Sequence, residues 1–181
     1  HSFPTRRSSD LTLSLSVFPA SQGMTDTTFV TAVWPYANHT TRTYLGIAAY
    51  LSLPTGEYSA SKAFNLGSNR YSQTLQVGYQ WPITQNINGA FAFDTVWYGA
   101  NSQCAAACSS PTNLQLTQKP LHSAQMGPIY RINQIYTIAA TYVYVTGGET
   151  AFNGVERNKT VVTQRYFVSG VAHTNIGRFM L

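Results

Sequence analysis

Three stretches of this sequence alternate strictly between two kinds of side chain, and each does so for 11 or 12 residues. They are residues 42–53, 71–81 and 87–98. A period of two residues is typical of a β-strand whose two faces meet different surroundings. Strands of soluble proteins are usually about 5–6 residues long, whereas a tilted strand that crosses a bilayer needs about 9–11. The alternation therefore predicts strands long enough to span a membrane.

The composition limits the alternatives. Of 181 residues, 44% are hydrophobic and only 9% are charged, against roughly 25% charged in an ordinary soluble domain. A disordered chain would combine low hydrophobicity with high charge. A membrane-spanning helix needs about 18 consecutive apolar residues, but the most apolar stretch, 135–145, is 11 long and contains Thr137 and Thr141. The formal charge is +5, yet the basic residues are scattered singly apart from Arg6-Arg7, so we expect no nucleic-acid partner.

Weaker strand patterns fill much of the remaining chain, and no helical period extends over a useful length. These further strands are expected at residues 12–18, 27–36, 121–130, 135–145, 160–170 and 178–181. Pro and Gly punctuate the gaps between them, which favours an antiparallel sheet built from successive hairpins. For 135–145 both faces are apolar, and the pattern does not indicate which face is turned inward.

The connections between the predicted strands alternate in length. The long ones are 54–70, 99–120 and 147–159, and the short ones are 82–86, 131–134 and 172–177. Outer-membrane barrels have short turns on one side and longer loops on the other, and strands in hydrocarbon must close into a barrel because no water can satisfy an open edge. We therefore expect an all-β fold, an antiparallel transmembrane β-barrel of the outer-membrane type, incomplete at both ends. Residues 1–11 are expected to be a non-native leader, and 12–181 a partial barrel domain.

The alternation assigns side chains to two faces. The expected lipid face carries Leu45, Ile47, Ala49, Leu51, Leu53, Leu75, Val77, Phe91 and Phe93. The expected lumen carries Arg42, Tyr44, Tyr50, Ser72, Thr74, Gln76 and Asp94. Asp94 supports this choice, because a carboxylate in mid-strand is costly against lipid. Within the lumen, the candidate binding residues are Arg42, Tyr44, Tyr50, Gln76 and Asp94.

Aromatic residues near the strand ends predict two bands at the lipid–water boundaries. The band at the short turns consists of Trp34, Tyr36, Tyr79, Trp81, Tyr130 and Tyr136. The band at the long loops consists of Tyr71, Trp97, Tyr98, Tyr142 and Tyr144.

Two cysteines, Cys104 and Cys108, lie in one small-residue loop. Without a nearby histidine they cannot complete a tetrahedral metal site, so we expect no metal and no cofactor. A short disulfide and two free thiols both remain open. In the preceding loop, Arg70 and Glu57 are candidates for an ion pair, or for two solvated charges.

Several motifs resemble those of the outer-membrane transporters of the phenol-degradation MetA-pathway type. They are Leu-Pro-Thr-Gly-Glu-Tyr at 53–58, Asn-Leu-Gly-Ser-Asn-Arg-Tyr at 65–71, Trp-Tyr-Gly-Ala-Asn at 97–101, and Gly-Gly-Glu-Thr at 147–150 with Asn153-Gly154. The similarity runs over most of 41–170. It implies an outer-membrane barrel that passes small hydrophobic molecules, and it implies no catalytic residues.

We therefore expect a channel in the bacterial outer membrane, with membrane lipid and small hydrophobic or aromatic solutes as its partners. A structural or adhesive barrel without transport is the alternative, followed by a soluble calycin-like ligand binder, whose surface would need more charge. We expect no enzyme activity, because His122 and Ser123 point to opposite faces and no nucleophile and base converge.

Overall fold

The computed structural model describes residues 23–157, 160–174 and 177–180, and within them the chain is built of β-strands and one short 3-10 helix. No helix in this part of the chain is long and apolar enough to cross a membrane. The predicted strand 12–18 and the predicted leader 1–11 lie outside the described residues. The main sheet contains β1 (Thr27–Asn38), β2 (Thr43–Leu53), β3 (Ser72–Pro82), β4 (Ile87–Tyr98), β7 (Leu121–Arg131), β8 (Tyr136–Gly147), β11 (Val161–Thr174) and β12 (Gly177–Met180).

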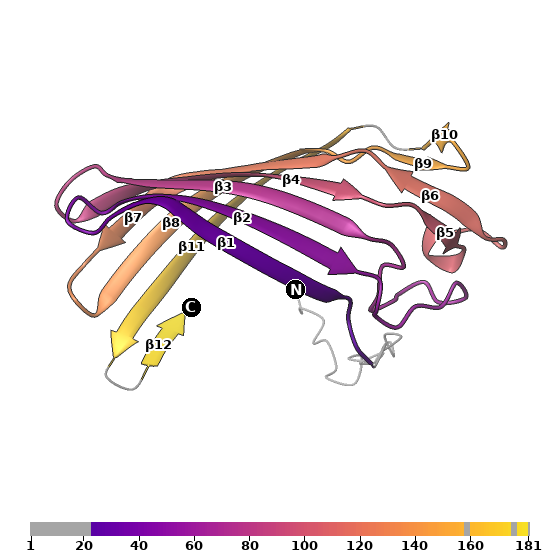
Figure 1. The fold of residues 1–181 in the computed structure, drawn as a ribbon, viewed down its shortest axis with the longest axis horizontal. Helices are drawn as coiled ribbons and strands as arrows, with labels where there is room; N and C mark the ends of the chain where they lie inside the picture. Colours follow the sequence, from indigo (N-terminus) through magenta and orange to yellow (C-terminus); the bar gives the residue numbers. More distant parts are fainter. Residues whose placement is uncertain (1–22, 158–159, 175–176, 181) are drawn as a thin grey trace, which may run out of the picture.

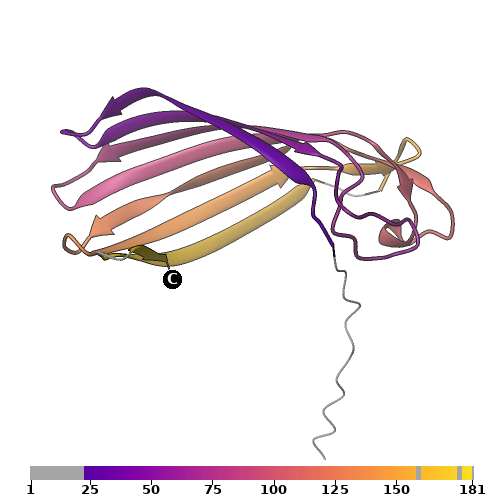
Figure 2. The same cartoon turned by 60° about the horizontal axis from the view of Figure 1, so that its bottom comes forward.

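Every neighbouring pair in the main sheet is antiparallel, and the strands follow the order β1-β2-β3-β4-β7-β8-β11-β12. All of them except β12 are 11 to 14 residues long, the length that a tilted strand needs to cross a bilayer. The sheet is a curved wall with one convex and one concave side, and β1 and β12 lie at its two edges (Figures 1 and 2). These strands confirm the predicted meander, with bounds that differ from the expected ones by a few residues.

The register keeps the two faces separate across the wall. Ile47, Val77 and Phe93 are direct partners on the convex side, while Gln76 is the direct partner of Asp94 on the concave side. In β3 from Ser72 to Gln80, the convex-side residues are exposed and their concave-side neighbours are half-buried. The two predicted sets of side chains therefore lie on opposite sides of the sheet, the apolar set on the convex side and the polar set on the concave side.

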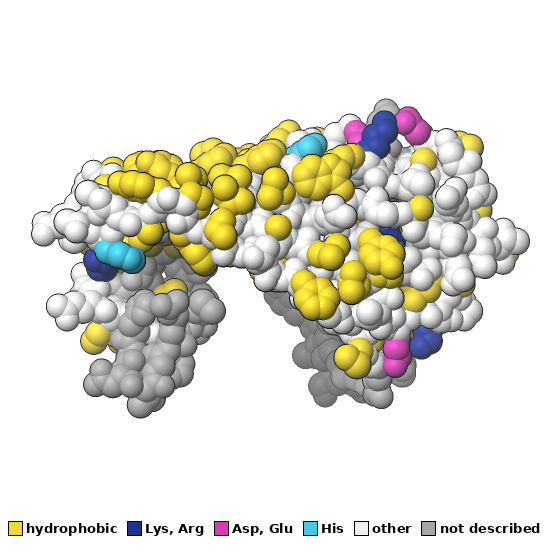
Figure 3. All heavy atoms as spheres, in the orientation of Figure 1, with side chains coloured by type: hydrophobic (Ala, Val, Ile, Leu, Met, Phe, Trp, Pro, Cys, Tyr) yellow, Lys and Arg dark blue, Asp and Glu magenta, His cyan; other side chains and the backbone are white. Residues whose placement is uncertain are grey.

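Apolar side chains gather over the convex side of the wall, and most charged side chains visible in Figure 3 lie toward its ends. Large apolar residues stay exposed there: Leu75 is 46%, Phe93 42% and Ile138 42% accessible. Among the described residues, no large side chain is completely buried. A sheet with its apolar face outward and no core beneath it is the arrangement that hydrocarbon, and not water, makes stable.

The structure also settles the two faces of β8. Tyr142 and Tyr144 pair with the convex-side residues Met126 and Ala124, so they lie on the convex side. Val143 pairs with Gln125 and lies on the concave side. The lumen wall is therefore partly apolar here, which is why the sequence pattern was ambiguous.

Trp34 does not belong to the outward aromatic band that the sequence predicted. The β1–β2 register shifts between Val33 and Tyr36, and Pro35 within this bulge has no backbone N–H to give to a ladder. The Trp34 indole lies over the concave side of Gly46, with Nε1 3.4 Å from the position that a β-carbon on Gly46 would take. A bulge changes the parity of the residues around it, so simple alternation misplaces this side chain.

The long connections form a second, smaller sheet that the sequence analysis did not predict. Its order is β10 (Val155–Glu156), β9 (Thr150–Phe152), β6 (Leu114–Gln118) and β5 (Asn101–Cys104). It extends from the loop end of the wall (Figure 1). The short helix η1 (Ala106–Cys108) follows β5, and the sulfurs of Cys104 and Cys108 are bonded, with their Cα atoms 5.6 Å apart.

Buried polar contacts tie the 54–71 loop to the small sheet. Asn101, only 3% exposed, donates from Nδ2 to the Tyr58 hydroxyl and to the Ser68 carbonyl, and accepts from the Asn69 side chain at 2.9 Å. The Tyr58 hydroxyl in turn donates to the Gln103 carbonyl at 2.9 Å. Because buried polar groups that all have partners hold a single arrangement, this cluster fixes the loops over one end of the wall.

Candidate functional site

The concave face of the wall is the candidate site, because its side chains are largely polar, whereas those of the convex face are largely apolar. Its inward rows combine tyrosines, glutamines and hydroxyl residues with many small residues. The small inward residues in the middle of the strands are Ala32, Gly46, Ala48, Gly78, Ala90, Ala92, Gly127 and Ala139. Small side chains leave space along the wall, and the larger polar ones stand out from it.

Three of the five candidate binding residues lie close together at mid-wall. The Tyr50 hydroxyl donates to Gln76 Oε1 at 3.3 Å, and Gln76 is the direct cross-strand partner of Asp94. Ser123, on the far side of Asp94, continues the row. The structure thus places a hydroxyl, an amide and a carboxylate in one belt across β2, β3, β4 and β7.

The other two candidates, Arg42 and Tyr44, lie at the short-turn rim and not in that belt. Arg42 has a left-handed backbone with φ of 55° and donates from Nη2 to the Thr84 carbonyl at 2.8 Å, which joins two neighbouring turns. Tyr44 hydrogen-bonds with His39 Nδ1 at 3.2 Å, and the two rings meet edge to face. The five residues therefore divide into a belt and a rim.

The opposite, loop-side mouth holds a cluster that the sequence analysis missed. The Arg70 guanidinium lies 4.4 Å from the centre of the Tyr98 ring and donates from Nη2 to Gln118 Oε1 at 2.8 Å. Tyr98 pairs with Ser72 on the inward row, so it does not belong to the outward band in which the sequence analysis placed it. Of the two alternatives for Arg70 and Glu57, the ion pair is not formed, and Arg70 is not a solvated charge either, since it binds Gln118 and Tyr98 and its Nη1 is buried. Because these partners are 28 and 48 residues away, only the fold reveals them.

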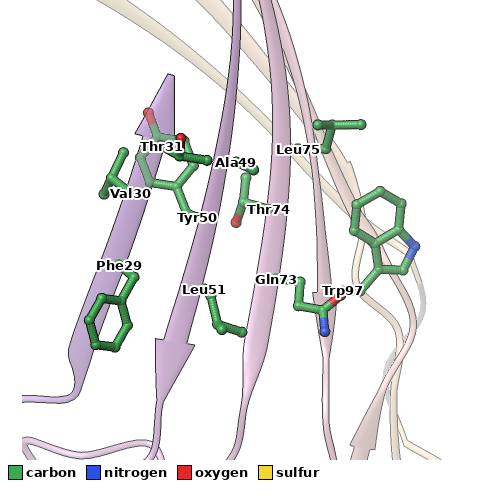
Figure 4. Close-up of a pocket in the computed structure, with 10 residues that line it drawn as sticks. All are labelled: Phe29, Val30, Thr31, Ala49, Tyr50, Leu51, Gln73, Thr74, Leu75 and Trp97. Carbon is green, nitrogen blue, oxygen red and sulfur yellow. The ribbon is translucent and has the colours of Figure 1, made fainter. Parts of the chain in front are cut away.

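A groove of about 460 Å³ opens on the wall near the loop end. Figure 4 shows its lower row running across four strands as Phe29, Leu51, Gln73 and Trp97, which are successive cross-strand partners on the convex face. Leu75 lines it higher up. Its outward lining is largely apolar, so we assign that part of the groove to the membrane surface, whereas Tyr50 and Thr74, which also line it, belong to the inward row.

His122, the histidine nearest to a possible nucleophile, is engaged on the convex side. Its Nδ1 lies 2.9 Å from Thr95 Oγ1, and its ring stacks with Phe93. The neighbouring Ser123 points into the lumen beside Asp94. The pair is thus split between two faces, as the sequence predicts.

Comparison with known proteins identifies relatives of this arrangement. A family model described as "Putative MetA-pathway of phenol degradation" matches residues 8–165. The crystal structure of the COG4313 outer membrane channel from Pseudomonas putida F1 superimposes with a TM-score of 0.76 at 24% identity, over 84% of this chain and 55% of that one. This chain therefore spans about half the length of that channel. No curated protein matches the sequence.

The structural match confirms the predicted fold class, an antiparallel sheet of the outer-membrane barrel type. The exposed apolar convex face is what the lipid-facing surface of such a barrel requires.

Proposed function

Since this chain belongs to the MetA-pathway of phenol degradation family, we propose that it forms the wall of an outer-membrane channel that passes small aromatic and other hydrophobic solutes by diffusion. The observation that carries the proposal is the concave face. A belt of Tyr50, Gln76 and Asp94 crosses it at mid-wall, on a surface that also carries many small residues. Such a surface can line a wet passage, whereas the convex face cannot.

The inward rings supply transient contacts for an aromatic solute. Tyr50 lies at mid-wall and Tyr44 at the short-turn rim, so a solute that passes along the concave face from one end to the other meets both. Stacking of two aromatic rings is worth about 0.5–1.5 kcal/mol, which slows passage little and releases the solute readily. Diffusion needs no cofactor, and its direction follows the concentration gradient.

The test is electrical. We expect the native protein, purified from outer membranes and inserted in planar bilayers, to conduct KCl, and we expect phenol to reduce the current in a concentration-dependent way. Tyr50→Leu removes an inward ring. The phenol concentration that gives half of the maximal reduction in current should therefore rise by roughly 2–10-fold, the equivalent of one ring contact.

Tyr79→Leu is the matched control, because Tyr79 lies on the convex side, where it is 43% exposed and stacks with Trp81. It should leave the response to phenol unchanged. A native protein that inserts and conducts nothing would contradict the channel and favour a structural or adhesive barrel.

A further inference from the structure

Arg70 stands at the loop-side mouth of the concave face. It precedes β3 by two residues, in phase with the inward residues Ser72 and Thr74, and its guanidinium packs 4.4 Å from the centre of the inward Tyr98 ring. A cation held against an aromatic face has a fixed position. A solute that enters from the loop side must therefore pass this charge.

No carboxylate neutralises this charge within the described residues. Nη2 donates to the neutral Gln118 amide, and Nη1 is shielded from solvent without any hydrogen-bond partner. The ion pair that the structure does contain, Lys119–Glu156 at 3.0 Å, lies exposed in the outer loops. Burial lowers the pKa of Arg70, but an arginine remains protonated in proteins, so the described part of the mouth carries a positive charge that no described carboxylate pairs with.

The rest of the described concave face is also positive. Arg131 pairs with Thr137, and Arg165 pairs with Val143, both on inward rows. Among the described residues of the main sheet, Asp94 is the inward carboxylate. Cations on a wall of low dielectric constant raise the local concentration of anions and repel other cations.

We propose that Arg70 is a selectivity residue of this channel, which favours aromatic carboxylates such as benzoate over neutral and cationic solutes of the same size. This inference rests on the proposed channel function. A carboxylate that enters the mouth brings the negative charge that neither Gln118 nor Tyr98 supplies to the guanidinium, and charge-assisted contacts of arginine with carboxylates are among the strongest that proteins make.

The experiment measures ion selectivity in planar bilayers across a KCl gradient, and then with potassium benzoate replacing KCl on one side. We expect the native protein to prefer chloride and benzoate over potassium. Arg70→Gln should reduce the benzoate-to-potassium permeability ratio by at least about threefold, as the loss of one focusing charge predicts. Arg70→Lys keeps the charge but not the fork or the stacking, so it should retain chloride preference and lose part of the preference for benzoate over chloride.

Arg157→Gln is the matched control. Arg157 also lies over an aromatic ring, 5.8 Å from the centre of Phe152, but it does so on the small outer sheet. The same loss of charge there should leave both ratios unchanged. If Arg157→Gln lowers the benzoate-to-potassium permeability ratio as much as Arg70→Gln does, the net charge of the protein sets selectivity, and not the charge at the mouth. That result would overturn the inference.

The outcomes separate this inference from the proposed function. A native protein without conductance would refute the channel itself. A native channel that conducts but prefers potassium, or an Arg70→Gln channel with unchanged ratios, would refute the role of Arg70 and leave the channel intact. If Arg70→Gln does not fold, as judged by heat-modifiable gel mobility, the native selectivity and Arg70→Lys still decide the question.

Discussion

Single residues outside the membrane fasten the loops to the wall, and Asp26 shows how. One of its carboxylate oxygens accepts the Gly56 backbone N–H at 2.9 Å, and the other accepts the Ser68 backbone N–H at 2.8 Å and the Ser68 hydroxyl. Partial burial alone would raise the pKa of Asp26, but the hydrogen bonds from Ser68 and Gly56 outweigh it and lower the pKa. Asp26 therefore joins the start of β1 to both ends of the 54–71 loop.

This lowered pKa predicts an acid-sensitive loop. A depressed carboxyl pKa gives stability that is present above the unfolded value of about 3.9 and is lost as the pH falls through the lower folded value. We expect pepsin to cleave the 54–71 loop slowly at pH 4–5 and progressively faster toward pH 2. Asp26→Asn should be cleaved several-fold faster already at pH 4–5, because an amide loses acceptors and charge. The control Glu57→Gln should resemble the native protein, and equal rates for native protein and Asp26→Asn would contradict the assignment.

At the scale of the strand, the β7–β8 ladder contains an irregular site at Gly127. The paired residues run from Met126↔Tyr142 directly to Ile129↔Ala139, since Pro128 has no N–H to donate. A β-carbon on Gly127 would collide with the backbone carbonyl of Ala140. The two strands approach so closely here that only glycine fits.

Gly127→Ala should therefore lower the free energy of unfolding by about 1–3 kcal/mol, as overpacking does elsewhere. Gly78→Ala is the control, because Gly78 is also inward and central, and its added β-carbon would meet nothing closer than 4.0 Å. Urea unfolding of protein folded in lipid vesicles measures the free energy of unfolding of both variants. Equal stability of the two variants would show that the β7–β8 approach is not a constraint.

The long strands of the wall could be predicted from the sequence because alternation acts over 11 or more residues; for 87–98 the predicted and observed bounds of β4 coincide. The short strands β5, β6, β9 and β10 could not. They are two to five residues long, and β6 pairs with β9 across more than 30 residues of sequence. Their stability comes from tertiary pairing, which no local pattern records.

The same reasoning applies to the candidate site. Tyr50, Gln76 and Asp94 follow strict alternation, so their common face was predictable. Trp34 lies within a bulge and Arg70 precedes its strand, so neither could be placed by counting residues. The tyrosine beneath Arg70 was assigned to the wrong face because aromatic residues at strand ends usually anchor in the interface.

At the scale of the whole molecule, the account depends on one division of surfaces: the convex face contacts hydrocarbon and the concave face contacts water. An apolar face without a core beneath it would aggregate in water, and a polar belt would be costly in lipid. Fold, location and proposed function all follow from this division. Because successive residues of each long strand lie on opposite faces, this division of surfaces can be tested at neighbouring positions of a single strand.

The most direct measurement is the reaction of single cysteines along β3 with a membrane-impermeant maleimide, in protein folded in lipid vesicles. The native Cys104 and Cys108 are bonded to each other and should not react. The account predicts rapid labelling of Thr74→Cys and Gln76→Cys, which face the lumen, and at least about tenfold slower labelling of Leu75→Cys and Val77→Cys, which face lipid. Equal labelling at all four positions, or faster labelling of the two convex-side cysteines, would contradict it.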